Sequence, residues 1–384
     1  MADASKTIVK ESDFEINDGN DASSAGSATE AGMVARLNQE YLKPNVGLIF
    51  LIVSQLFNSL MVVSTKVLEL DREGLEPDEP SIQPLQILLV RMIITYIGTL
   101  IYMKINSSSI EYVPFGNPAV RPWLIMRGAM GFFGVFGMYF SLMYLTISDA
   151  VLITFLAPSV TIILAWIILR ESFSKAEGIG SFVSLAGVVL IVRPTFLFGN
   201  PTTSDGDIDE TTDPHKRLIA TLVALWGVVG ISSVWIIIRY IGKRAHAIIN
   251  VSYFSLITGL IALFGILFVP SVHFQTPRTL KQWLLFANLG ICGFCHQLLL
   301  TIGIQKERAG RGTLMSYTNL IYAVFWDVLL FGHWPSFWSI CGMILITGST
   351  LYIVKMKAND AKPQAVNNNS IQTEFDLEDL SSVR

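Results

Sequence analysis

Four ionisable side chains lie inside long apolar runs of this chain, where they could hold a charged solute. Arg91 lies well inside one run, Arg127 is near the start of the next, and Lys66 is near the end of the first. The deep acid of this set is Asp327. Charges inside apolar segments are costly and are functional candidates by default. Three cations against one acid predict an electropositive cavity that binds a small organic anion through charge-assisted hydrogen bonds.

Polar and aromatic residues at helical spacing extend this set. Residues three, four, seven or eleven positions apart share one face of a helix, so the polar residues of the first run form a stripe with Lys66. An amide and two aromatic rings form a similar face in the ninth run. The candidate substrate-binding residues are Arg91, Lys66, Arg127, Asn58, Gln55, Asn319, Tyr322, Trp326, Trp235 and Gln297.

Two residues are candidates for proton coupling, and several candidates have a structural alternative. His296 can titrate near neutral pH, and Asp327 is an acid deep in the ninth run. Lys66 and Arg127 could instead anchor helix ends at the headgroups. Arg91 could be a structural charge paired with Asp327 or with backbone carbonyls. The aromatic stripes could serve packing alone.

The segments that must position these residues are apolar runs of membrane-spanning length. Such a run matches a bilayer because a helix of about twenty residues crosses roughly 30 Å of hydrocarbon. The chain is 52% hydrophobic and 15% charged, against about 25% charged residues in soluble domains. Alternation of period two is absent from these runs, which excludes a barrel. We predict an all-α integral membrane protein with ten transmembrane helices near 46–68, 84–104, 123–145, 149–169, 175–193, 216–240, 248–270, 281–304, 312–331 and 336–356.

The tails and loops predict the orientation. Residues 1–43 and 358–384 are polar and acidic and are predicted to be disordered. With the N-terminus inside, fourteen lysines and arginines face the cytoplasm and six face the other side. This asymmetry predicts that both termini are cytoplasmic and that the acidic loop 194–215 faces the lumen or exterior. The choice between plasma membrane and endomembrane stays open.

The chain repeats itself. A shift of 162 residues places Gly128 on Gly290 and Gly131 on Gly293, and it brings three predicted helices of each half into register. Five helices per half is an odd number, so the second copy must enter the membrane from the opposite side. We predict two inverted repeats, 44–193 and 216–357, an architecture that secondary transporters use to alternate access around a midplane site.

Some other patterns have simpler explanations. Gly128, Gly131, Gly134 and Gly137 recur every third residue, and such small faces let membrane helices pack closely. Cys292 and Cys295 share the spacing of redox or metal motifs but lack a second pair, so we interpret them as packing residues. The sequence lacks a phosphate-binding loop and catalytic zinc or nucleophile-elbow motifs. We therefore expect no cofactor, no metal, no nucleic acid partner and no enzyme activity.

The segment from Asp149 to Pro194 has a helix with a central proline (Pro158), an acidic residue closing it (Glu171), and a glycine-bearing helix after that. This pattern resembles the EamA domain of the drug/metabolite transporter superfamily. Arg91 and the RGAMGFFGVFGMYF stretch are also similar to the subgroup G branch of solute carrier family 35 and its fungal relatives. The second half departs from the pattern, because Leu320 and His333 stand at the positions of Pro158 and Glu171. The resemblance implies a ten-helix carrier whose central cavity is lined by helices 1–4 and 6–9. Substrates in the superfamily range from amino acids to nucleotide sugars and carboxylates.

Together, residues and resemblance predict a secondary transporter in a lipid bilayer that moves a small organic anion by alternating access. One alternative is a carrier of a neutral or amphipathic metabolite in which the intramembrane charges are structural. A second alternative is a membrane regulatory protein that does not transport. A homodimer is compatible with each of these three functions.

Overall fold

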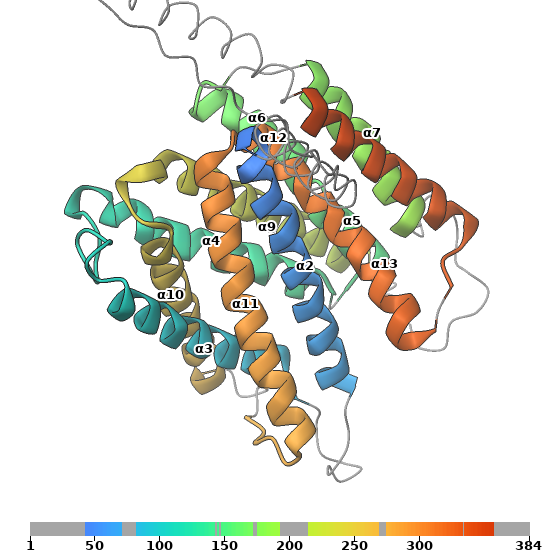
Figure 1. Cartoon of the computed structure of the whole chain (residues 1–384). Coiled ribbons are helices and arrows are strands. Elements are labelled where there is room, and N and C mark those ends of the chain that lie inside the picture. Colours follow the sequence, from blue (N-terminus) through green and yellow to red (C-terminus); the bar gives the residue numbers. More distant parts are fainter. Residues whose placement is uncertain are drawn as a thin grey trace, which may run out of the picture. The chain divides into compact units, whose positions relative to one another are not determined.

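Helices account for nearly all of the described chain (Figure 1). The computed structural model describes residues 43–70, 82–142, 144–145, 147–171, 175–192, 214–268, 274–332 and 334–356. No strand occurs in these ranges, so the all-α prediction is confirmed for them. The two predicted tails and most of the acidic loop 194–215 lie outside the described residues.

The first half contains five membrane-length segments, one of which is broken. They are α2 (Lys43–Leu70), α3 (Pro84–Ile105), α4 (Arg121–Leu142), the broken pair α5 (Ile147–Thr154) and α6 (Ala157–Ile168), and α7 (Lys175–Val192). A short 3-10 turn, η2 (Pro118–Val120), precedes α4.

The second half follows the same plan. It contains α9 (Pro214–Ile241) with the turn η3 (Gly242–Arg244), α10 (Ala247–Phe268), α11 (Leu280–Lys306), a broken segment, and a last helix, Phe337–Met356. The broken segment consists of α12 (Ala309–Leu314), η4 (Met315–Tyr317) and α13 (Thr318–Phe331).

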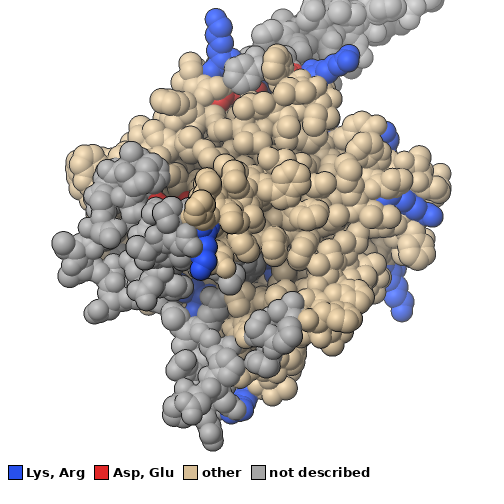
Figure 2. All heavy atoms as spheres, turned by 180° about the vertical axis from the view of Figure 1, so that it is seen from behind, with Lys and Arg blue, Asp and Glu red and all other residues tan. Residues whose placement is uncertain are grey.

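These helices have the length and surface of membrane spans. Nine helical segments in the described ranges are long and apolar enough to cross a bilayer, and α4, with 22 residues, makes a tenth of matching length. Large apolar side chains point outward, among them Phe182 and Phe268, which are 75% and 74% exposed. Figure 2 shows a face on which uncharged residues predominate among the described residues, while most of the lysines and arginines lie toward its margins. Such a surface suits hydrocarbon rather than water.

One span in each half is broken near the same repeat position. Pro158 cannot donate the amide hydrogen bond that would continue the helix from Thr154, so α5 ends there. The second half breaks at η4 although Leu320 replaces the proline. The shift of 162 residues places Phe155 on Tyr317, and these two rings stack with centroids 6.0 Å apart. Because repeat-equivalent residues touch each other, the pseudo-two-fold axis of an inverted repeat passes between them.

Glycines at equivalent repeat positions make equivalent contacts. A Cβ at Gly128 would lie 2.7 Å from Ile257 on α10, and one at Gly290 would lie 2.5 Å from Ile94 on α3. Further along α4, a Cβ at Gly137 would lie 2.6 Å from the Cα of Gly227 on α9. The glycine face of α4 therefore allows two neighbouring helices to approach its backbone, as small faces do in membranes.

Candidate substrate site

Arg127 is the most deeply buried charge at the centre of the candidate site. It lies in the second turn of α4 and is 1% exposed. Its guanidinium stands 4.4 Å from the ring centroid of Phe254 on α10, and its Nη2 donates to Oε1 of Gln297 on α11 at 3.0 Å. Within the described part of the chain, Nε and Nη1 have no hydrogen-bond partner. A buried cation with open donors is stabilised by an anion that accepts them.

His296 joins this group to the first helix. Its Nδ1 donates to the backbone carbonyl of Ser54 on α2 at 2.8 Å, and the ring is 7% exposed. Figure 1 shows α2 and α11 running side by side, consistent with this bond. Gln55, the residue after Ser54, is also buried. The assignment of His296 to proton coupling stays a prediction.

Arg91 reaches the same region from α3. It is half-buried and packs against Gly293 on α11, where a Cβ would lie 2.9 Å from its Nε. His296 lies within electrostatic range of both Arg91 and Arg127. Three helices, α3, α4 and α11, thus bring together four of the residues predicted from the sequence.

Phe254 belongs to this group but was not among the predicted residues. It is an aromatic residue among the mostly apolar residues of α10, so its type gave no signal. The internal repeat gives such a signal, because Gly131 packs on Phe254 just as Gly293 packs on Arg91. Phe254 therefore occupies, in the second repeat, the place that Arg91 has in the first.

The other predicted residues lie elsewhere or have other contacts. Trp326 donates its indole N–H to Ser59 Oγ on α2 at 3.0 Å. Trp235 is buried in the apolar core beside Gly312. Lys66 is exposed near the end of α2, and the choice between a substrate contact and a helix-end anchor stays a prediction.

Three predicted residues are placed only by their helix and burial. Asn58 on α2 and Tyr322 on α13 are half-buried, as is Asn319, whose Oδ1 has no partner in the described region. The side chain of Asp327 lies outside the described part, so its pairing with Arg91 stays untested.

Ion pairs connect the two repeats at one end of the bundle. Glu171, between α6 and α7, accepts from Arg239 Nε on α9 and from the Ala309 amide at the start of α12, both at 3.0 Å. Glu177, at the start of α7, lies 3.1 Å from Arg311 Nε and 3.7 Å from Arg308 Nη1. The predicted orientation makes this the cytoplasmic end.

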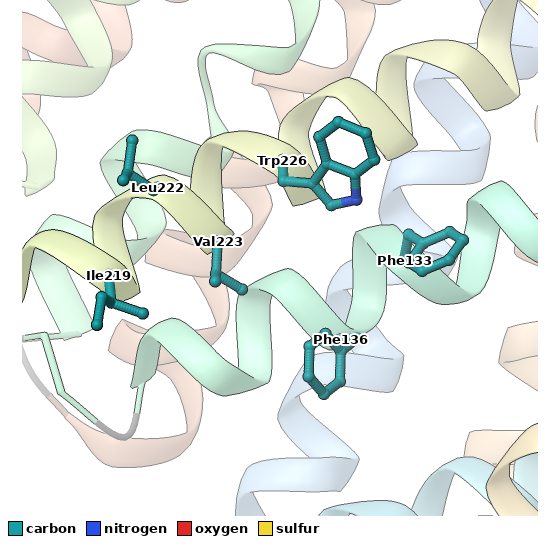
Figure 3. Close-up of a pocket in the computed structure, with 6 residues that line it drawn as sticks. All are labelled: Phe133, Phe136, Ile219, Leu222, Val223 and Trp226. Atoms are coloured by element: carbon teal, nitrogen blue, oxygen red, sulfur yellow. The ribbon is translucent and has the colours of Figure 1, made fainter. Parts of the chain in front are cut away.

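A hollow on the outer surface offers no polar group that could bind an organic anion. It has a volume of about 350 Å³ and lies between α4 and α9 (Figure 3). Its lining is entirely apolar: Phe133, Phe136, Ile219, Leu222, Val223 and Trp226. Trp226 and Phe133 are 62% and 40% exposed, so the hollow faces lipid when the chain is in a membrane.

The fold and the buried polar group define a multi-pass integral membrane protein built from two inverted five-helix repeats. The EamA-like transporter family matches residues 45–193 and 218–355. The chain belongs to this family and is a membrane transporter. This places its two halves in the family that the segment from Asp149 to Pro194 resembles.

Relatives agree with this membership. The chain is 61% identical over 376 residues to "Uncharacterized membrane protein YMR253C" of Saccharomyces cerevisiae, covering 95% of this chain and 90% of that protein. It is 58% identical to "Probable transport protein YPL264C" of the same yeast, covering 90% and 98%. It is 28% identical to human "Solute carrier family 35 member G1", covering 62% and 63%. A solved crystal structure with 18% identity aligns at a TM-score of 0.62, covering 82% of this chain and 99% of the other, which shows a shared fold.

Proposed function

We propose that this transporter is a secondary carrier that moves a small organic anion by alternating access. The observation that carries the proposal is Arg127, whose buried guanidinium has one protein hydrogen bond, to Gln297, and two nitrogens with no partner in the described ranges. Removing an unpaired cation from water is expensive. A substrate anion bound at Arg127 offsets that cost and explains why the cation is there.

The surrounding residues support a site of net positive charge. Arg91 and Arg127 approach His296 from different helices, and Phe254 supplies an aromatic face under the Arg127 guanidinium. Binding here places the anion on α3, α4, α10 and α11, which come from both repeats. A solute held between repeats is released to either side when the repeats rock against each other.

The ion pairs of Glu171 and Glu177 support a closed arrangement at one end. They join the α6–α7 connection of the first repeat to α9 and α12 of the second. Release of solute at that end requires these contacts to separate. We propose that this end faces the cytoplasm, as the distribution of lysines and arginines predicts, with both termini on the same side.

A thermal-stability screen with organic anions tests the proposal. A ligand at a hundredfold excess over its dissociation constant stabilises the folded state by about 2.7 kcal/mol. We expect stabilisation by an anion to be lost in Arg127→Gln. Arg121→Gln is the matched control, because Arg121 begins the same helix but is exposed. The control should keep the anion-induced shift.

The alternative of a neutral or amphipathic substrate predicts a different result. In that case Arg127 is a structural charge held by Gln297 and Phe254. Anions would then give no shift, or the shift would survive in Arg127→Gln. Either result would contradict the anion carrier and favour a neutral metabolite.

A further inference from the structure

Asn250, in the first turn of α10, is fully buried. Its exposed fraction is 0%, and neither Nδ2 nor Oδ1 has a hydrogen-bond partner in the described part of the chain. A carboxamide offers two donor hydrogens and an acceptor oxygen. Leaving such a group unsatisfied costs about 1–3 kcal/mol per donor or acceptor. A buried carboxamide with both groups open is a candidate for contact with a water molecule or with a bound solute.

Asn250 shares a helix face with the residue under Arg127. Residues four apart lie one above the other on a helix, so Asn250 is one turn before Phe254 and Thr258 is one turn after it. The guanidinium of Arg127 stands on the Phe254 ring. The amide thus lies one helical turn from the ring on which the Arg127 guanidinium stands.

Unpartnered polar atoms gather on the helices around this point. In the described part of the chain, four buried side chains with such atoms lie on neighbouring helices: Thr95 on α3, Arg127 on α4, and Asn250 and Thr258 on α10. Helix α10 packs directly against both α3 and α4. The open donors and acceptors therefore lie on helices that pack against one another.

The chemistry of these atoms restricts what can satisfy them. An anion accepts hydrogen bonds from Arg127, but it has no hydrogen to give the Asn250 oxygen. The partner of Oδ1 must be a donor. An ammonium group would stand in the field of two guanidinium groups, Arg91 and Arg127, which repels it. A hydroxyl group is neutral and both donates and accepts, as water does, so a solute hydroxyl matches the amide and can take the place of a water there.

We propose that Asn250 is a substrate-contacting residue and that the transported anion carries a hydroxyl group beside its charged group. This inference rests on the proposed function and names its substrate class, the hydroxylated organic anions. Arg127 holds the charge, and Asn250 distinguishes the hydroxylated solute from its deoxy analogue. Such discrimination is strong in principle, because an analogue that lacks the hydroxyl leaves the buried amide unpaired.

Pairs of anions that differ by one hydroxyl test the inference. Malate with succinate, lactate with propionate, and glycerate with lactate are compared by the thermal shift of the detergent-purified full chain. In the wild type we expect at least one hydroxylated anion to bind about tenfold or more tightly than its analogue. In Asn250→Leu that preference should vanish while the weaker binding of the analogue persists.

Asn288→Leu is the matched control. Asn288 is also an intramembrane amide, on α11, but its Nδ2 already donates to Ser64 Oγ at 2.8 Å. Its loss should leave the hydroxyl preference intact. Equal loss of preference in both variants would overturn the inference, because it would reflect general damage rather than contact with the substrate.

Two outcomes separate this inference from the proposed function. A wild type that binds both members of every pair equally, with binding lost in Arg127→Gln, overturns the role of Asn250 but keeps the anion carrier. Absence of any shift with the hydroxylated anions also overturns the inference. The wild-type comparison needs no variant, so it decides the matter even if Asn250→Leu fails to fold.

Discussion

At the scale of single residues, the site depends on contacts that link positions far apart in the chain. Arg127 donates to Gln297 across 170 residues, and His296 donates to Ser54 across 242. The sequence indicated Arg127, Arg91, Gln297 and His296 because polar side chains are conspicuous within apolar runs. It could not indicate Phe254, whose role is set by the cation that lies on its ring.

His246, between η3 and α10, gives the fold a dependence on pH. Burial lowers the pKa of this side chain below its ordinary value of 6.5, and its Nδ1 accepts from the Ile248 amide at 3.3 Å, which caps α10. The unfolded chain binds this proton more readily, so the contribution to stability is complete above pH 6.5 and declines as pH falls below it.

We expect the melting temperature of the wild type to decrease as pH is lowered below 6.5, with part of that decrease absent in His246→Asn. Asparagine can cap a helix without titrating in this range. The measurement is a series of melting curves for both proteins. Identical pH profiles would show that His246 binds its proton equally well in the folded and the unfolded protein.

At the scale of helices, close approach is set by glycine. The glycine face of α4 packs on α9 so tightly that a Cβ at Gly137 would stand 2.6 Å from Gly227 Cα. Backbone cannot yield as a flexible side chain can. The spacing of these glycines predicted close packing, but the partner helices became known only from the structure, because spacing on one helix does not specify its neighbour.

Gly137→Ala should destabilise the protein by about 1–3 kcal/mol, the usual cost of overpacking. Gly348→Ala is the control, since Gly348 lies within the last helix and a Cβ there would meet nothing within 4 Å. Alanine at that position should be neutral or slightly stabilising. Equal melting temperatures for the two variants would contradict the tight contact of α4 with α9.

The ion pairs between the repeats should contribute unequally to the free energy of unfolding. Glu177 is 4% exposed in its side chain and lies closer to Arg311 than to Arg308, which is itself 27% exposed. Arg311→Gln should therefore lower the free energy of unfolding by about 1–3 kcal/mol, because it leaves a buried carboxylate short of its nearest donor. Arg308→Gln should have a smaller effect. Melting curves in which Arg308→Gln is the more damaging would show that the pairing is misassigned.

At the scale of the whole molecule, the length of the apolar runs predicted the fold well. Membrane thickness fixes the length of a span, so ten runs predicted ten helices, and the odd number per repeat predicted inversion. The break at η4 was not predicted, because Leu320 carries no helix-breaking signal at the position of Pro158. At this break the Tyr317 hydroxyl donates to the Phe155 carbonyl at 3.3 Å, a tertiary contact that the spacing of residues along the chain does not show.

The candidate site was predicted less completely than the fold. Charges within spans indicated that a solute site exists, but Asn250 lies at a helix start, where the sequence could not distinguish an interfacial amide from a buried one. Asn250 is fully buried in the structure, and α10 packs against α3, α4 and α11. Such burial depends on how helices from both repeats assemble.

The most direct test of the anion carrier is uptake by proteoliposomes. Purified wild-type, Arg127→Gln and Arg121→Gln proteins are reconstituted, and entry of a labelled organic anion chosen by the thermal screen is measured against the unlabelled anion inside. We predict saturable exchange for the wild type and Arg121→Gln, and a loss of at least about tenfold for Arg127→Gln, since a charge-assisted contact contributes about 1.5–3 kcal/mol. Undiminished exchange by a folded Arg127→Gln protein would contradict the central role of this buried cation.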